Sequence, residues 1–471
     1  LSKREREREK CLKQCHRPVL MMAATAASSS DSRSEAGVGE APSTLQLFLK
    51  SSLEELARVA SKAGEMDVED SCARTLNSLN KLGRNDTSYI VPLLQGMRSS
   101  KKTLVPVALD GVHKLVSFGL LDGNLPGSTS HSSLLADDIV LSAVTSFQLN
   151  DERIHLQLVK TLVALVTSHE FPVHDNSLLE AFRTCYHIVL IAKSPDTQSA
   201  AKAALLQMLD TVFQMFYEPD FTDFENESEE HLSVTLRDGL QIFRALCKLA
   251  ERGHNSRITA AYIQNKVLAL ELLQSILQTY PSVVGSNLFF ISTMKKHLIR
   301  AVLQCVLDKI PVLFQHSLNV MLVLFEDFRL VMRNELAMFF NNFFVLALSG
   351  RKSQVAEKIL VLQILSKVSE DKDILCDVFL GIPPENASQD ELEEQEELKS
   401  DLAKNVEDMH HILQDVLGLI RSPADVPDKD LLARVVELMQ TIMTYFHDEE
   451  LDSDTGLHRS ATMHLGKPVD L

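Results

Sequence analysis

The chain has 471 residues, of which 45% are hydrophobic and 24% charged, and its formal net charge at pH 7 is −17. This length is too great for one ordinary hydrophobic core and predicts two to four units, or one extended array of helical pairs. The acidic balance argues against sequence-independent binding to nucleic acid, which needs a basic face, and makes the surface as a whole a poor ligand for anionic lipid, although it leaves room for a local basic patch. A composition dominated by Leu, with no Trp and six Tyr, favours helices over strands.

The first segment, residues 1–43, is predicted to be disordered because its second half is rich in Ala, Ser and Gly. The chain begins with Leu rather than Met, so the true start of the protein stays open. From Thr44 onward, apolar residues recur at steps of three and four, which is the spacing of one face of a helix. We therefore expect a first helical domain over residues 44–217. Its later helices are predicted at 69–82, 90–99, 102–118, 134–147, 151–168, 176–193 and 196–216.

Residues 218–230 carry seven carboxylates and no basic side chain, which predicts an acidic linker or a domain boundary. A second helical domain is expected over residues 231–384. Its helices are predicted at 231–252, 258–280, 287–307, 311–326, 332–348, 354–369 and 372–380. A second acidic linker, residues 385–400, precedes two further helices within 401–448, and the tail 449–471 is predicted to be disordered.

Nowhere does the sequence alternate apolar and polar residues over the length that a strand needs. Consecutive helices of fifteen to twenty residues, joined by short loops and recurring in pairs about every 40 residues, are typical of armadillo and HEAT repeats. The predicted fold is therefore all-α, an armadillo/HEAT-like α-solenoid of stacked antiparallel helices. No strict repeated motif accompanies this spacing.

The sequence offers little catalytic chemistry. His169, Glu170 and His174 resemble a zinc-protease motif, but the two His are five residues apart and Pro172 lies between them, so a plain loop is the better interpretation. Cys11 and Cys15 have one residue too many between them for a haem-attachment motif. No nucleotide-binding loop and no serine-hydrolase elbow is present. We expect no catalytic residues, no cofactor, no metal and no small-molecule substrate.

Other candidate features have simpler structural explanations. The lone His residues His113, His187 and His297 are interpreted as surface or hydrogen-bonded side chains. The Phe339, Phe340, Phe343 and Phe344 cluster predicts a buried helix rather than a ligand groove. The seven scattered Cys are expected to be free thiols in a reducing compartment, mostly buried. Five charged residues interrupt the longest apolar stretch, which excludes a membrane span there and indicates a cytoplasmic protein.

Three stretches resemble one family. Residues 181–209 contain Arg183-Thr-Cys-Tyr-His followed by an Ala-Lys-Ala-Ala-Leu-Leu-Gln-Met-Leu helix, and residues 108–115 read Ala-Leu-Asp-Gly-Val-His-Lys-Leu. A weaker match covers residues 318–381. Together these resemble the N-terminal regulatory half of the large Arf guanine-nucleotide exchange factors of the BIG type, which holds a dimerisation and cyclophilin-binding region and a homology region upstream of the catalytic domain. The chain departs from the family at residues 381–384, Gly-Ile-Pro-Pro, where the family has Asn-Tyr-Asp-Cys.

The resemblance implies a non-catalytic scaffold that self-associates, binds an Arf or Arf-like GTPase, and associates peripherally with Golgi or endosomal membranes. Nothing after Glu385 resembles an exchange domain. One alternative is a truncated form of a complete exchange factor, and another is a relative of the Mon-two-like type without that domain. A third is a general armadillo/HEAT adaptor in trafficking or nuclear transport. The polar residues Arg183, Lys193 and Lys202 on the best-matching helices are candidates for a partner surface.

Overall fold

The computed structural model describes residues 44–79, 87–127, 134–215, 232–253, 259–308 and 310–332, with a few further positions between 335 and 367. Several predictions concern residues outside these ranges. They are the disordered ends 1–43 and 449–471, the acidic linkers 218–230 and 385–400, the helix 372–380, nearly all of the helices 332–348 and 354–369, the helices within 401–448, and the cluster at Phe339.

The regular elements of the described ranges are all helical, as predicted, and these ranges contain no strand beyond one isolated bridge between Pro126 and Leu134. We call residues 44–215 the first block; its main helices are α2 (Thr44–Ala63), α3 (Met66–Ser78), α4 (Val91–Arg98), α5 (Val105–Ser117), α6 (Leu135–Thr145), α7 (Glu152–Thr167), α8 (Asp175–Ile191) and α9 (Pro195–Gln214). We call residues 232–332 the second block; its helices are α10 (Val234–Glu251), α11 (Ala260–Thr279), α12 (Pro281–Ser286), α13 (Leu288–Thr293), α14 (Ile299–Leu307) and α15 (Pro311–Asp327).

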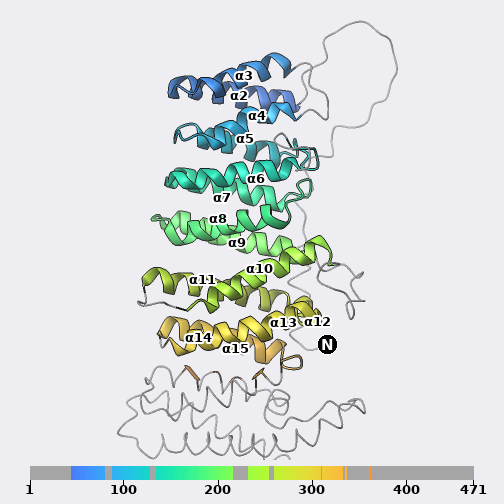
Figure 1. Ribbon diagram of the computed structural model, residues 1–471, viewed down its shortest axis with the longest axis vertical. Coiled ribbons are helices and arrows are strands. Elements are labelled where there is room, and N and C mark those ends of the chain that lie inside the picture. The colour runs from blue at the N-terminus through green and yellow to red at the C-terminus, as the bar shows by residue number, and fades with distance from the viewer. Residues whose placement is uncertain are drawn as a thin grey trace, which may run out of the picture. The chain divides into compact units, whose positions relative to one another are not determined.

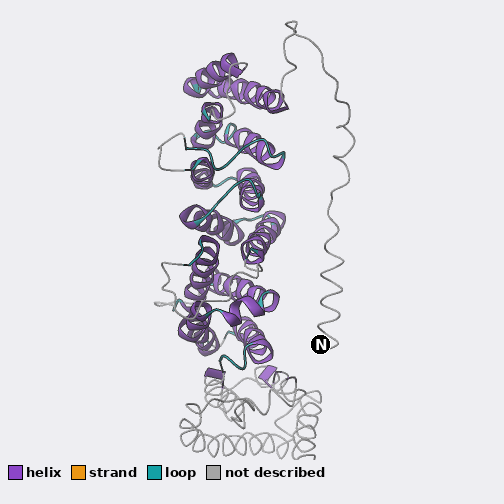
Figure 2. Cartoon of the chain, turned by 90° about the vertical axis from the view of Figure 1, so that its right-hand side faces the viewer, coloured by secondary structure: helices purple, strands orange, loops and turns teal. Residues whose placement is uncertain are grey.

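The main helices form two layers that run side by side through both blocks (Figures 1 and 2). In one layer α2, α5, α7, α9, α11 and α15 pack on one another in that order, and in the other α3, α4, α6, α8, α10 and α14 do the same. Each helix also packs on a chain neighbour in the opposite layer, as α4 does on α5 and α8 on α9. This is the arrangement of an α-solenoid, so the predicted fold class is confirmed.

Local sequence signals set many helix starts. Proline stands in the first turn of α4, α5, α9, α12 and α15, where its missing N–H costs nothing. Asp151 caps α7, Ser233 caps α10 and Thr259 caps α11, each accepting a hydrogen bond from a backbone N–H of the first turn. For the main described helices the predicted and observed bounds agree to within three residues at most ends, and the largest difference is four residues, at the end of α3, which was predicted at 82 and lies at Ser78.

Between α11 and α14 the second block departs from a simple pair of helices. The short helices α12 and α13 follow α11, and a π-helical turn, Met294–Leu298, joins α13 to α14. The single helix predicted over 287–307 is therefore a helical run with one wider turn inside it. Asn287 begins this run by accepting hydrogen bonds from the backbone N–H groups of Phe289 and Phe290.

Candidate functional site

The three predicted surface residues lie on separate elements. Arg183 is exposed on α8 and forms an ion pair with Glu180, 2.6 Å away, one turn earlier. Lys193 follows α8, and its backbone N–H donates to Glu152 Oε1 at 2.6 Å. Lys202 on α9 forms an ion pair with Glu271 on α11 at 2.7 Å. Within the described part of the chain, no hydrogen bond or ion pair joins the three side chains, so the structure does not assemble them into one site.

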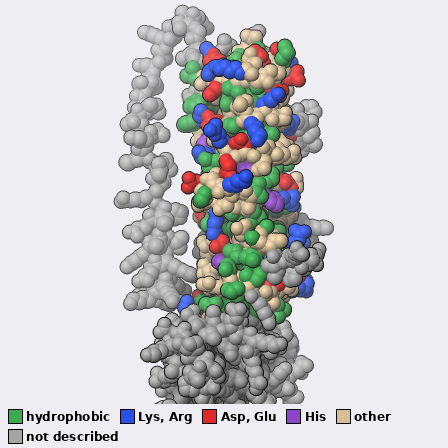
Figure 3. Space-filling model, turned by 90° about the vertical axis from the view of Figure 1, so that its left-hand side faces the viewer, with side chains coloured by type: hydrophobic (Ala, Val, Ile, Leu, Met, Phe, Trp, Pro, Cys, Tyr) green, Lys and Arg blue, Asp and Glu red, His purple; other side chains and the backbone are tan. Residues whose placement is uncertain are grey.

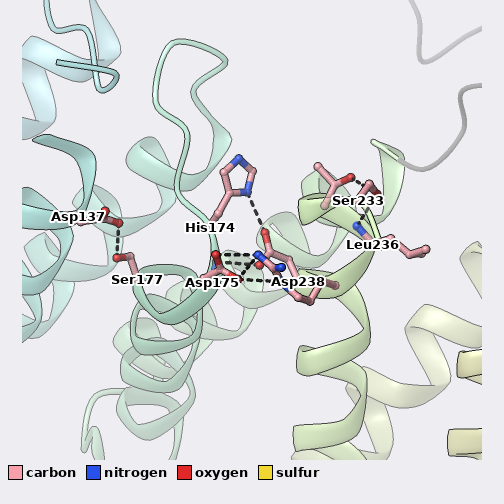
Figure 4. Close-up of polar contacts among 9 residues, drawn as sticks. Asp137, His174, Asp175, Ser177, Ser233, Leu236 and Asp238 are labelled. Atoms are coloured by element: carbon pink, nitrogen blue, oxygen red, sulfur yellow. Dashed lines mark hydrogen bonds and ion pairs between the residues drawn. The ribbon is translucent and has the colours of Figure 1, made fainter. Parts of the chain in front are cut away.

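A different set of polar side chains meets where the two blocks join. At the first turns of α8 and α10, the carboxylate of Asp238 is almost fully buried, with its side chain 2% exposed. It accepts hydrogen bonds from the backbone N–H of Asp175 at 2.7 Å and from Nδ1 of His174 at 2.8 Å (Figure 4). Next to it, the Arg237 guanidinium donates two hydrogen bonds of 3.0 Å to the Asp175 carboxylate. We call these four residues the junction cluster.

The junction cluster also fixes an unusual backbone conformation. The backbone of Asp175 has a φ angle of 50°, in the left-handed region that residues other than glycine rarely adopt. Asp is among the residues that tolerate this region best, and here both its N–H and its carboxylate are held by α10. The first turn of α8 therefore takes its conformation from contacts with the second block.

The electrostatics of the junction cluster favour a charged imidazole. The hydrogen bond to Asp238 raises the pKa of His174, burial opposes that shift, and the nearby carboxylates of Asp238, Asp175 and Asp137 raise it further. Asp137 is engaged by the Ser177 hydroxyl, which donates to it at 2.5 Å (Figure 4). His174 and Asp238 thus form an ion pair that strengthens as the pH falls below the raised pKa of His174.

Three further polar contacts join the blocks. Tyr186 on α8 donates its hydroxyl to the backbone carbonyl or the side-chain oxygen of Asn265 on α11, both at 2.7 Å. The ion pair of Lys202 with Glu271 connects α9 to α11, and the Tyr280 hydroxyl at the end of α11 donates to Asp210 on α9. Both layers therefore carry polar contacts across the junction, in addition to the packing of α8 on α10 and of α9 on α11.

Inside the second block, a lysine and an aspartate are buried together. Lys266 Nζ lies 3.1 Å from Asp308 Oδ2, and the side chains are 1% and 2% exposed. Tyr262 donates its hydroxyl to the same carboxylate at 2.9 Å, and the ammonium lies 4.9 Å from the centre of the Tyr262 ring. Burial lowers the pKa of Lys266, but Tyr262 and the Asp308 carboxylate more than offset that effect, and the pKa stands above its ordinary value. The Lys266 ammonium is therefore charged at neutral pH.

The described cysteines have the character of buried structural thiols. Cys72, Cys185, Cys247 and Cys305 are free and buried, as predicted. Burial raises the pKa of Cys72 and of Cys305 to about 11 and that of Cys185 to about 12. A thiol must ionise to act as a nucleophile or as a metal ligand, so these side chains are poorly suited to either role at neutral pH.

The described residues also contain no group of three or more His, Cys, Asp or Glu side chains placed to hold a metal ion. His169 and Glu170 lie in the loop between α7 and α8, as predicted, and His174 is engaged with Asp238. His297 pairs with Glu251 at 3.2 Å, in agreement with its interpretation as a hydrogen-bonded side chain. None of the helices described is long and apolar enough to cross a bilayer.

Comparison with known families places the two blocks in adjacent domains. Residues 40–219 match the dimerisation and cyclophilin-binding domain of Mon2/Sec7/BIG1-like proteins, and residues 235–381 match the HUS domain of the same proteins. The two matches together cover more than half of the chain. The chain belongs to the Mon2/Sec7/BIG1-like family. The resemblance inferred from the Arg-Thr-Cys-Tyr helix and its neighbours is thereby confirmed.

Curated relatives include large exchange factors. The chain is 25% identical over 357 residues to the fission yeast ADP-ribosylation factor guanine nucleotide-exchange factor sec71, in a match that covers 62% of this chain and 20% of that protein. It is 38% identical over 127 residues to the human brefeldin A-inhibited guanine nucleotide-exchange protein 1, covering 26% of this chain and 7% of the human protein. Against brefeldin A-inhibited guanine nucleotide-exchange protein 3 of Arabidopsis thaliana the identity is 22% over 399 residues. The chain spans about a quarter or less of the length of these relatives.

The family assignment places the junction cluster at the boundary between two family domains. The two matched domains divide between α9 and α10, so the contacts of His174, Asp175, Arg237 and Asp238 fasten one family domain to the next. Sequence reasoning missed this cluster because its partners are 62 to 64 residues apart in the chain. The only local signal of the cluster was His174 followed by Asp175 at the start of a helix, and two such residues do not by themselves indicate a site.

Proposed function

We propose that this chain is the non-catalytic regulatory part of an Arf exchange factor, acting as a scaffold that self-associates and binds an Arf or Arf-like GTPase. The observation that carries the proposal is the match to two consecutive regulatory domains, which pack as neighbours in one helical stack. The name of the first domain supports self-association, and the names of the relatives support a connection to Arf. In this proposal the protein holds its partners on helix faces and is recruited peripherally to Golgi or endosomal membranes.

Self-association is tested by sedimentation velocity of the purified chain over a range of concentrations. We expect a reversible dimer. GTPase binding is tested by titrating the chain with an Arf-like GTPase loaded with a non-hydrolysable GTP analogue, and with the GDP form as the control. A chain that is monomeric at all concentrations and binds neither form would remove the proposal.

The non-catalytic character has its own test. The chain is added to an Arf protein loaded with fluorescent GDP, and nucleotide release is followed over time. We expect the rate of release to remain at its spontaneous value. Accelerated release would show that exchange activity resides in this chain. Sequencing the transcript beyond codon 471 decides whether an exchange domain follows, which is the alternative of a truncated exchange factor.

Lys202 offers a test of the proposed partner surface, because its ion pair with Glu271 must be separated from any contact with a GTPase. Lys202→Glu places two carboxylates together, whereas the double variant Lys202→Glu with Glu271→Lys restores the pair with its polarity reversed. If Lys202 contacts the partner, both variants lose binding. If the double variant binds normally, Lys202 serves only the fold. Arg183 can be tested in the same way with Glu180.

The general armadillo/HEAT adaptor is less well supported. That hypothesis required the family resemblance to be only a similarity between Leu- and Ala-rich helices. Two separate domain models of one family match in their expected order, and chance similarity between helices does not account for that.

A further inference from the structure

An open groove of about 980 Å³ lies between α8, α10 and the beginning of α11. Its lining residues lie between Leu179 and Leu190 on α8, between Ala245 and Gly253 at the end of α10 and just beyond it, and between Thr259 and Asn265 at the start of α11. The junction cluster holds the first turns of α8 and α10 together, whereas the groove is lined by their later turns. Figure 1 shows α10 inclined relative to α8, which accounts for the space between their later turns.

The groove has an apolar lining. The half-buried side chains of Leu179, Leu190 and Leu249 line it, and the aromatic rings of Phe182 and Tyr186 lie among them. Residues 179, 182, 186 and 190 recur at steps of three and four, so one stripe of α8 forms a whole wall. An apolar wall along a groove between helices suits the apolar face of another helix.

The charges around this groove differ from those of the chain as a whole. The chain carries a net charge of −17, but the groove lining contains three cations, Arg183, Lys248 and Arg252, and a single carboxylate, Glu251. That carboxylate is already engaged by Arg300 of α14 at 3.1 Å and by His297 of the preceding π-helical turn at 3.2 Å. Lys248 and Arg252 are exposed and form no ion pair within the described residues.

His187 in the groove is consistent with this charge balance. Burial lowers the pKa of His187 and the Arg183 guanidinium lowers it further, while Glu180 acts in the opposite direction. On the surface of Figure 3, by contrast, acidic, basic and apolar side chains are intermixed without one dominant charge. The groove therefore combines an apolar wall with more cations than carboxylates among its lining residues.

We propose that the groove binds an acidic amphipathic helix of a partner protein, whose apolar stripe packs along α8 and whose carboxylates pair with Lys248 and Arg252. The wall from Leu179 to Leu190 is about 16 Å long at 1.5 Å per residue, which accommodates about three turns of helix. Two cations that form no ion pair among the described residues favour an acidic ligand over a basic one. This binding is additional to the proposed GTPase binding and does not depend on it.

The probe is a synthetic fluorescein-labelled helical peptide with a leucine stripe and glutamate on its flanks, titrated with the full chain and followed by fluorescence anisotropy. A second peptide keeps the leucine stripe and carries lysine in place of glutamate. We expect the acidic peptide to bind at least tenfold more tightly than the basic one, and its affinity to fall as salt is added. Equal affinities, or no binding of the acidic peptide, would overturn the proposal.

Substitutions in the chain locate the binding. Lys248→Glu with Arg252→Glu should weaken binding of the acidic peptide by at least tenfold, and Ala261→Trp, at an exposed position of the rim, should block the groove with a similar loss. The matched control is Lys101→Glu with Lys102→Glu, which changes the net charge equally at two exposed positions outside the groove lining. The control should bind within twofold of the original chain. Circular dichroism checks that each variant is folded, and an equal loss in the control would contradict the proposal.

The same experiments distinguish two other possible occupants of the groove, a second copy of this chain and the chain's own acidic run. If Ala261→Trp also abolishes self-association in sedimentation velocity, the groove is an interface between copies of this chain, and the assignment to a partner is wrong. If neutralising the seven carboxylates between residues 385 and 397 raises the affinity for the acidic peptide at least tenfold, the chain's own acidic run occupies the groove. That result would likewise overturn the assignment to a partner.

Discussion

The two blocks of the helical stack bury their polar side chains in different ways. In the first block, the buried hydroxyls of Thr75 and Ser146 donate to the backbone carbonyls of Ser71 and Ala143, in the preceding turn of the same helical run. In the second block, the buried ion pair of Lys266 and Asp308 joins α11 to the end of α14. A hydroxyl that is satisfied within its own helix places no demand on a neighbour. A buried ion pair is satisfied only when two particular helices meet in one register, so it specifies the packing of the second block.

The largest effect is expected from breaking this ion pair. Asp308→Ala leaves the Lys266 ammonium buried without its counter-ion, and loss of one partner of a buried pair costs about 3–5 kcal/mol. Urea unfolding followed by circular dichroism measures the change. Replacing both members, with Lys266→Met and Asp308→Leu, should recover most of the lost stability, because no charge then remains buried. A double variant as unstable as Asp308→Ala would show that the pair itself is not the cause.

The junction cluster should give the next largest effect. Asp238→Ala removes the acceptor of the Asp175 N–H and of His174, and unsatisfied buried donors cost about 1–3 kcal/mol. We expect faster amide hydrogen exchange in the first turns of α8 and α10, with α4 and α5 unchanged. Asp238→Asn keeps one carbonyl oxygen and should lie between the original chain and Asp238→Ala. Protection that falls equally in α4 would argue for global destabilisation instead.

Substitution of two helical glycines in the first block, Gly96 and Gly111, should change the free energy of unfolding by less, and the two variants can be compared directly. A Cβ at Gly96 would lie 2.9 Å from Ala108 Cβ, an atom that cannot rotate away, whereas a Cβ at Gly111 would meet the mobile end of Leu93. Overpacking costs about 1–3 kcal/mol, and alanine in place of glycine returns about 1 kcal/mol in a helix. Gly96→Ala should therefore lower the free energy of unfolding by about 1 kcal/mol, with Gly111→Ala close to neutral. Thermal unfolding of the two variants side by side checks this order.

The smallest effect concerns pH. His174 has a folded-state pKa above its value in the unfolded chain, which is about 6.5. Its contribution to stability is therefore complete below about pH 6.5 and is lost as the pH rises through the raised pKa. The difference in unfolding free energy between the original chain and His174→Gln should be larger at pH 5.5 than at pH 8.5. Because the side chain is partly exposed, we expect less than about 1 kcal/mol. A difference that grows toward high pH would contradict the assignment of the ion pair.

Much of the fold followed from local pattern. The steps of three and four apolar residues predicted the helices, and the predicted starts at 196 and 311 agree with α9 and α15, each of which has a proline in its first turn. The start of α8 shows what the local pattern leaves out. The sequence predicts this helix over 176–193, and in the structure it begins one residue earlier, at Asp175, with the Ser177 hydroxyl donating to Asp137 in α6. That start is held by α10, so local residues alone could not reveal it.

For the candidate site, the sequence predicted only the family to which the chain belongs and not the residues that meet at the junction. The Arg-Thr-Cys-Tyr stretch indicated the family, and the structure shows that its Tyr186 fastens α8 to α11. The charged residues chosen from the same helices, Arg183, Lys193 and Lys202, lie apart, and their role as a partner surface stays a prediction. Exposure and charge can be read from a helical pattern, but the side chains that meet across a junction cannot.

The sequence by itself determined the helical content, the ends of most helices and the family, because these depend on neighbours within about four residues or on short runs of similar sequence. Only the tertiary structure decided that Asp238 would fix the first turn of α8, that Lys266 would pair with Asp308, and that a cationic groove would lie beside the junction. Each of these depends on residues about 40 or more positions apart in the chain. Their proximity follows from how helices of the two layers pack on one another, which local periodicity does not specify.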